Sequence, residues 1–178
     1  PSIAPSIKAA QDFIAVNRIQ VAPEFIEKRV VNPRYRYAGT VDSLALIEGK
    51  FGVLDIKTSQ SIYRDYNLQT AAYMDALKHQ FGNLQTRWIM RVDQNRTCAI
   101  CGSTLRSKGG REKIRDPYPR PGGWRGCPAD GHQWRELMGV VELKEFPFWE
   151  DDFQAFLGAK RLWEWEHKSW LARIGYLI

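Results

Sequence analysis

The sequence predicts an α/β protein in which helices flank a mixed β-sheet and a cysteine-rich arm is inserted between two strands. Three observations lead to this prediction. Two strand-like runs, 37–47 and 51–58, are joined by a Glu-Gly-Lys turn. A helical run, 67–80, and another strand-like run, 84–92, follow them. The composition then changes abruptly to glycine, proline and arginine, with all three cysteines of the chain.

The length and composition suit one globular domain. The chain has 178 residues, of which 44% are hydrophobic, enough for a full core. Its formal net charge is +6, which fits a polyanionic partner. No apolar run is long enough to span a membrane, and no signal peptide is visible. We therefore expect an intracellular protein, cytoplasmic or nucleoid-associated, without a membrane partner. A start at Pro1 rather than Met is compatible with an excised domain whose targeting information lies upstream.

The remaining elements follow from apolar spacing. Residues 6–18 predict a short amphipathic helix, 21–31 the first strand and 134–145 the last strand. Residues 149–171 predict one long helix, with acidic residues in its first turn. The side chains expected to cover the sheet from this helix are Phe153, Phe156, Leu157, Leu162, Trp163 and Trp170.

Two aspartates and a lysine lie in the central pair of strand-like runs. In a hairpin, Asp42 can sit beside Asp55, and Lys57 points the same way as Asp55 because strand side chains alternate. Paired carboxylates suit Mg²⁺ or Mn²⁺, and a metal beside a lysine suits phosphodiester hydrolysis. A buried Asp–Lys ion pair on a structural hairpin is the alternative that spacing alone leaves open.

The segments GTVD, LDIKTS and QTAAY occur in this order between residues 39 and 73. Together they resemble the motif series of the PD-(D/E)XK nuclease superfamily, and within it the RecB-like exonuclease branch. The resemblance covers about residues 24–77 well, and the strand and helix after the cysteines loosely. It implies a restriction-endonuclease-like core and a Mg²⁺- or Mn²⁺-dependent deoxyribonuclease, an exonuclease first of all. The implied setting is DNA repair, recombination or phage DNA processing.

Carried over by position, the resemblance assigns catalytic roles within the hairpin. Asp42 and Asp55 would be metal ligands, and Lys57 would be the catalytic lysine. The backbone carbonyl of Ile56 would be a further ligand. Val41 stands where the superfamily's name has proline.

Three residues outside the hairpin also match the family pattern. Gln69 and Tyr73 match the family's QxxxY motif, which lies beside the active site and contacts DNA. By spacing alone they are one face of a helix that packs its tyrosine on the sheet. Glu27 would reach the metal site from the edge, or else be a surface charge paired with Lys28 or Arg29.

Relatives carry a histidine motif upstream of the first strand, whereas no histidine precedes His79 here. Either that helix lies before Pro1 or this protein lacks it. The resemblance implies DNA as the partner, as single strands or duplex ends, and leaves open a helicase or recombination partner. Two alternatives remain: a DNA-binding module with a nuclease fold and weak or no catalysis, and an endonuclease.

The cysteine-rich arm has the spacing of a metal site. Cys98 and Cys101 form a CxxC pair, and Cys127 and His132 supply a second pair. Three thiolates and one imidazole complete the tetrahedral set of a structural Zn²⁺. Zinc would fold a segment too poor in aliphatic residues to build its own core. The alternatives are a redox CxxC pair or unrelated free thiols.

Basic residues and aromatics fill the space between the two ligand pairs. Basic side chains can bind phosphates and aromatics can stack on bases, whereas a solvated loop is the alternative. We expect nuclease-core residues at 1–93 and 134–178, and the zinc-binding basic arm at 94–133. The expected DNA-binding residues of the arm are Arg106, Lys108, Arg111, Lys113, Arg115, Arg120, Trp124 and Arg125.

Overall fold

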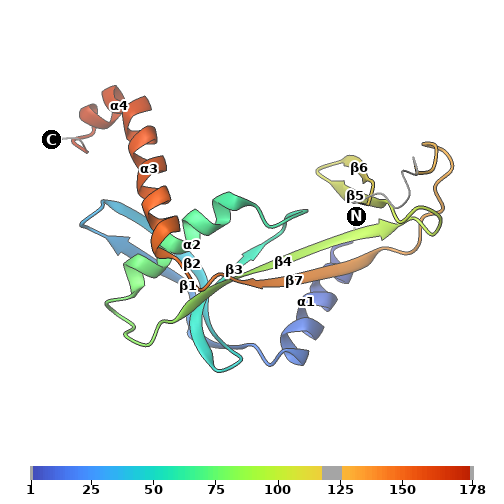
Figure 1. Ribbon diagram of the computed structural model, residues 1–178, viewed down its shortest axis with the longest axis horizontal. Helices are drawn as coiled ribbons and strands as arrows, with labels where there is room; N and C mark the ends of the chain where they lie inside the picture. The colour runs from blue at the N-terminus through green and yellow to red at the C-terminus, as the bar shows by residue number, and fades with distance from the viewer. Residues whose placement is uncertain (1, 118–125, 177–178) are drawn as a thin grey trace. The chain divides into compact units, whose positions relative to one another are not determined.

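A computed structural model describes residues 2–117 and 126–176 and has the expected α/β class (Figure 1). In the described part of the chain, a mixed seven-stranded sheet has the order β1-β2-β3-β4-β5-β6, and β7 pairs with β4. The elements are α1 (Ala4–Val16), β1 (Gln20–Asn32), β2 (Tyr37–Ile47), β3 (Lys50–Lys57), α2 (Arg64–Leu77), β4 (Thr86–Thr97), β5 (Thr104–Lys108), β6 (Arg111–Arg115), β7 (Met138–Glu145), α3 (Glu150–Glu166) and α4 (Lys168–Arg173).

The chain divides into two compact units. Unit 1 comprises residues 1–17, 57–60 and 91–142, and unit 2 comprises residues 18–56, 61–90 and 143–178. None of the helices in the described part of the chain is both long enough and apolar enough to cross a membrane.

The β2–β3 hairpin turns where the sequence predicts, but its loop is one residue shorter than the predicted Glu-Gly-Lys turn, because Lys50 already belongs to β3. Ile47 pairs with Lys50, so Glu48 and Gly49 alone form the loop. Both residues have positive φ, 52° and 78°, as a type I′ turn requires. This turn fixes the register of the strands that carry the two aspartates.

The core of unit 2 lies between α2 and the strands β1, β2 and β3. Gly39 admits Tyr73, because a Cβ there would lie 2.8 Å from the tyrosine ring. Gly52 similarly lets β3 approach Thr86, since a Cβ there would lie 2.1 Å from the Thr86 carbonyl oxygen. The buried cluster consists of Val30, Val41, Leu44, Val53, Tyr73, Met74 and Leu77.

The first half of α3 packs mainly on α2 instead of covering the sheet as predicted, and the prediction that its second half is also packed is wrong. Phe153 is 4% exposed and packs against the small residues Ala71 and Ala72 of α2. Phe156 and Leu157 also contact this cluster. Beyond Leu157 no side chain of the helix belongs to it, so the expected sheet-covering residues Leu162, Trp163 and Trp170 are exposed. The predicted single helix also ends at Glu166, and α4 follows after His167.

Within unit 1, α1 packs closely on β7. A Cβ at Gly139 would lie 2.2 Å from the carbonyl oxygen of Pro5, so only glycine fits. The side chain of Gln94 donates to the Ser2 carbonyl at 2.8 Å, which ties the start of the chain to β4. The arm also contains an unpredicted hairpin, in which β5 and β6 pair from Thr104/Arg115 to Lys108/Arg111.

Candidate functional site

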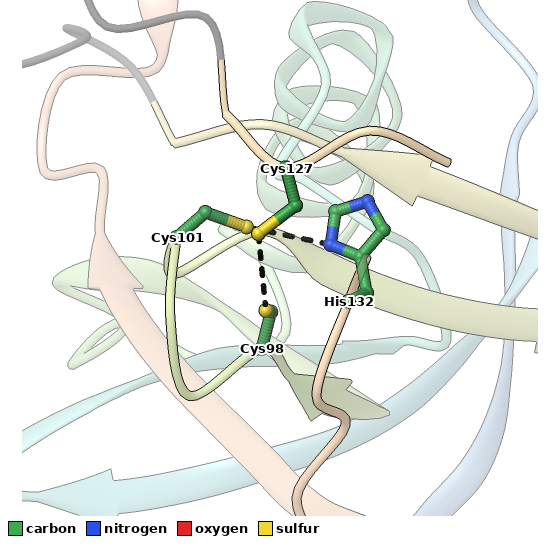
Figure 2. Close-up of side chains that lie close together, drawn as sticks. All are labelled: Cys98, Cys101, Cys127 and His132. Carbon is green, nitrogen blue, oxygen red and sulfur yellow. Dashed lines mark hydrogen bonds between the residues drawn. The ribbon is translucent and has the colours of Figure 1, made fainter. Parts of the chain in front are cut away.

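Three cysteines and one histidine of unit 1 converge as the sequence predicts (Figure 2). Their ligand atoms all lie within 4.8 Å of one another. Cys98 Sγ lies 4.0 Å from Cys127 Sγ, and Cys101 Sγ lies 3.4 Å from His132 Nδ1. Three sulfur donors and one nitrogen donor gathered in this way suit a tetrahedral site. The cluster could therefore hold a metal ion such as zinc.

A tight turn after β4 presents the first two thiols. Gly102 donates its N–H to the Cys98 carbonyl at 3.0 Å, and Cys98 donates its own to Ser103 at 2.8 Å. Gly102 has a φ of 71°, a conformation that glycine adopts without steric cost. Cys98 and Cys101 are buried as a result, and both sulfur atoms face the same point.

The segment that carries the histidine is held to the same turn by main-chain hydrogen bonds. Ala99 donates to the Gln133 carbonyl at 2.8 Å, and Arg135 donates to the Thr97 carbonyl at 3.0 Å. These bonds run on both sides of a bridge between Cys98 and Trp134. These main-chain contacts alone therefore hold the segment that carries His132 beside the two cysteines.

The pKa shifts of Cys127, Cys101 and His132 fit a cation at the centre of the cluster. Burial raises the pKa of Cys127, and the thiols of Cys101 and Cys98 raise it further, to about 12. Burial alone would raise the pKa of Cys101, but hydrogen bonds to Ser103 lower it to about 5. Bonding to Cys98 raises the pKa of His132. The Cys127 thiol therefore resists ionisation next to Cys98 and Cys101, because three thiolates would repel one another. A bound divalent cation removes this repulsion.

In unit 2, Asp42 and Asp55 meet where the β2–β3 ladder ends. The paired positions end at Ser43 and Leu54, and the next step of the same register sets Asp42 opposite Asp55. Asp55 is 1% exposed, whereas Asp42 is half-buried. The Ile56 N–H donates to Asp42 Oδ2 at 2.7 Å. The two carboxylates that the sequence pairs are therefore neighbours across adjacent strands.

The backbone of Ile56 faces the same aspartate. Its N–H meets the Asp42 side chain one step beyond the last paired positions, Ser43 and Leu54. The ligand role of its carbonyl oxygen stays a prediction. Lys57 is half-buried and ends β3, two positions after Asp55.

Glu27 lies on β1, the other neighbour of β2, at the level of the Asp42 and Asp55 pair. Its neighbours Ile26 and Lys28 both pair with β2, which sets Glu27 opposite Asp42. Glu27 is exposed and has a φ of 52°, an uncommon conformation for a non-glycine residue. Among the described residues it forms no ion pair, including with Lys28 and Arg29. Three acidic positions thus form a row across β1, β2 and β3.

Gln69 and Tyr73 line a hollow of unit 2. Gln69 Nε2 donates to the Tyr73 hydroxyl at 2.7 Å, as their spacing on α2 allows. The hollow has a volume of about 310 Å³ and is also lined by Tyr37, Gly39 and Phe156. Among the described residues that line it, neither aspartate of the row is included.

The described basic residues of the arm lie on the strands of the β5–β6 hairpin. Facing pairs of this hairpin place Arg106 opposite Lys113 and Lys108 opposite Arg111. Arg111, Lys113 and Arg115 are all exposed, and they share one face because they alternate along β6. The predicted contacts Arg120, Trp124 and Arg125 lie outside the described residues.

Arg106 differs from the other basic residues of the arm. Its Nε donates to Asp93 Oδ1 at 2.6 Å, and its Nη2 lies 3.5 Å from the Thr58 carbonyl oxygen. Asp93 also lies 3.8 Å from Arg91, whose Nη1 donates to the Ser59 carbonyl at 3.4 Å. All of these residues belong to unit 1, and the two carbonyls follow Lys57 directly. Sequence reasoning missed this network, because it joins distant segments that carry no local signal.

Comparison with models of protein families gave no match to this chain, and a search of curated proteins gave no match either. The geometry of the acidic row and of the cysteine–histidine cluster is therefore the basis on which a function can be inferred.

Proposed function

We propose that the chain is a metal-dependent DNA nuclease of the RecB-like exonuclease kind within the PD-(D/E)XK superfamily. The observation that carries this proposal is the row of acidic residues across β1, β2 and β3, with Asp42 held by the Ile56 amide beside the buried Asp55. Two carboxylates at facing positions of adjacent strands form the kind of oxygen-donor set that a hard divalent cation prefers.

The residues present fit such a cation. Asp42 and Asp55 would hold Mg²⁺ or Mn²⁺, with the Ile56 carbonyl and Glu27 as further oxygen donors. When bound, the cation would supply Lewis-acid activation of a phosphodiester and of the attacking water. The Lys57 ammonium would donate a hydrogen bond that orients this water and would offset negative charge on the phosphate. Gln69 and Tyr73 would contact the DNA strand beside the site.

We propose zinc as the metal of the Cys98, Cys101, Cys127 and His132 cluster, and a structural role for it. Four protein ligands leave no open position for a substrate water, which is the mark of a structural rather than a catalytic zinc. The exposed basic face of β6 lies on the hairpin between Cys101 and Cys127 of this cluster. Zinc would thereby fix the base of a DNA-contacting arm.

The test is a cleavage assay with end-labelled single-stranded and duplex DNA, in Mg²⁺, in Mn²⁺ and without divalent ions. We expect metal-dependent release of label by the unchanged chain and none by Lys57→Ala or Asp55→Asn. Asp151→Asn is the matched control, because Asp151 is an exposed aspartate in the first turn of α3. Full activity of Asp55→Asn would contradict the mechanism.

Binding of Mn²⁺ to the zinc-loaded chain, followed by electron paramagnetic resonance, gives a readout that is independent of turnover. Asp42→Asn and Asp55→Asn should weaken this binding, whereas Asp151→Asn should not. Unchanged Mn²⁺ binding in both row variants would rule out the proposed metal ligands.

The exposed basic face of the arm favours a second candidate, a DNA-binding module with weak or no catalysis. Such a protein would bind DNA with a strong salt dependence yet release no label in any metal. A third candidate, an endonuclease, would cut closed circular DNA, which a strict exonuclease leaves intact.

A further inference from the structure

A basic hollow lies between the β1–β2 turn and α3, within unit 2. It has a volume of about 180 Å³, and four cationic side chains line it. Arg34 and Arg36 come from the turn, and Lys160 and Arg161 come from α3. Glu164 is the one acidic residue among its described lining. The excess of positive charge is the first indication of an anionic ligand.

The acidic residue of the hollow is already neutralised. Lys160 forms an ion pair with Glu164 one helical turn away. Burial works against the charge of Lys160, but its bonds to Glu164 and Tyr176 raise its pKa overall. The same bond to Lys160 lowers the pKa of Glu164. The charges of Lys160 and Glu164 cancel each other, so the positive charges of Arg34, Arg36 and Arg161 remain available to a ligand.

Tyr176 holds Arg36 in place. Arg36 Nη1 donates to the Tyr176 carbonyl at 2.6 Å, and its guanidinium lies 5.1 Å from the centre of the Tyr176 ring. The Tyr176 hydroxyl lies 2.9 Å from the Arg36 carbonyl oxygen. Arg36 has a φ of 51°, so its backbone is kept in an uncommon conformation by these contacts. The guanidinium is thus positioned in advance and keeps further N–H donors for a ligand.

Arg34 and Arg161 carry the remaining charge. Both are exposed, and neither forms an ion pair within the described residues. The turn that carries Arg34 is fixed, because Tyr35 donates its N–H to Asn32 Oδ1 at 3.0 Å and stacks edge-on against Phe153 of α3. Planar guanidinium groups that line one hollow can match the oxygens of a phosphate group.

An exposed aromatic side chain one helical turn beyond Arg161 indicates what carries the phosphate. Trp165 follows Arg161 by four residues on α3, so the two side chains share one face of the helix. Trp165 is 73% exposed, the most exposed tryptophan of those described. A flat exposed ring next to a phosphate site suits the stacking of an unpaired base.

We propose that this hollow binds a backbone phosphate of single-stranded DNA, with the adjacent base stacked on Trp165. The inference extends the proposed nuclease function, because it adds a strand contact away from the acidic row. It concerns binding alone, so it can be tested where no cleavage occurs.

The test measures binding of a fluorescent single strand of about 12 nucleotides by anisotropy, without divalent ions, between about 50 and 200 mM salt. The variant is Arg34→Gln/Arg161→Gln. The control is Arg18→Gln/Lys144→Gln, which removes the same charge from exposed positions of unit 2. Thermal melting of both variants checks that the fold is kept.

Loss of the one phosphate contact should lower the slope of log affinity against log salt by about 0.7, whereas the control should change it little. Trp165→Ala should weaken binding of the single strand roughly tenfold and binding of the duplex much less. A double variant that binds like the control overturns the proposal, and so does an unchanged chain that binds no single strand at low salt.

The outcomes separate this proposal from the nuclease proposal. A lowered slope in a protein that cleaves in no metal would support the phosphate site and reject the nuclease. Metal-dependent cleavage by the unchanged chain, together with an unchanged salt slope in the double variant, would support the nuclease and reject the phosphate site. If Trp165→Ala alone has no effect, the phosphate contact stands and the stacked base is rejected.

Discussion

Asp42 Oδ2 accepts the main-chain N–H of Ile56 at 2.7 Å, where the paired part of the β2–β3 hairpin ends. The carboxylate therefore has two separable properties. Its oxygen supports the end of β3 as a hydrogen-bond acceptor, and its charge is available to a cation. Substitutions that remove one property without the other distinguish structure from chemistry at this position.

Asp42→Asn should keep the fold and abolish cleavage, because an amide oxygen still accepts from Ile56 but lacks the charge. Asp42→Ala should also lose the hydrogen bond, at a cost of about 1 kcal/mol in the free energy of unfolding. Urea denaturation and the end-label assay measure the two effects. Cleavage by Asp42→Asn at the unchanged rate would exclude a ligand role.

Removal of metal from the cysteine–histidine cluster should loosen the turn after β4. We expect the purified chain to carry zinc, and Cys127→Ser to lose it, since one of four ligands is absent. Metal analysis measures the zinc content, and hydrogen exchange at residues 97–104 measures the loosening of the turn. Ser107→Ala, on the nearby β5–β6 hairpin, is the control. Equal reactivity of all thiols with and without chelator would show that no metal is bound there.

Arg106 and Arg111 both belong to the basic arm, but their roles should differ. Arg106 is 14% exposed and ion-paired with Asp93, which is 7% exposed, so Arg106→Gln removes the shorter of the two ion pairs of Asp93 and leaves the one with Arg91 at 3.8 Å. We expect a loss of about 2 kcal/mol in the free energy of unfolding. Arg111→Gln should leave stability unchanged and weaken DNA binding instead. Equal stability of the two variants would contradict this assignment.

Tyr37 should make unit 2 sensitive to alkaline pH. Burial raises its pKa above the ordinary 10.0, against a hydrogen bond from Asn32 and with support from Asp75. The folded state therefore holds this proton more tightly than the unfolded state does. The resulting stability is complete below pH 10 and is lost progressively as the pH rises above it.

Urea unfolding between neutral pH and about pH 11 measures this loss. Tyr37→Phe should flatten the alkaline part of the curve, although its stability at neutral pH is lower because the hydroxyl no longer donates to the Ala72 carbonyl. Tyr63→Phe is the control, since Tyr63 is 44% exposed. An unchanged alkaline slope in Tyr37→Phe would assign the pH dependence to another group.

The central hairpin and the metal cluster could be predicted because their signals are local. Alternating apolar residues and a Glu-Gly turn define β2 and β3, and the spacing of four ligands defines the cluster. The registers that bring Glu27, Asp42 and Asp55 into one row follow from these strands and from β1.

The β5–β6 hairpin and the break in the last helix could not be predicted in this way. The strands of the hairpin are almost wholly charged or polar, so they lack the apolar alternation that indicates a strand. The break at His167 has neither proline nor glycine beside it. The basic hollow joins Arg34 to Arg161 across more than a hundred residues, a contact that no local pattern encodes.

The cysteine–histidine cluster has a consequence for protein engineering. Cys101 and Cys127 bracket the whole β5–β6 hairpin, and a metal at the cluster would hold both ends of that segment at one point. The entropy of closing a loop grows slowly with its length, by about 0.6 kcal/mol for each doubling. The turn between Lys108 and Arg111 at the tip of this hairpin should therefore accept inserted recognition loops at small entropic cost, while Ser103 and Arg106 keep their bonds to Cys101 and Asp93.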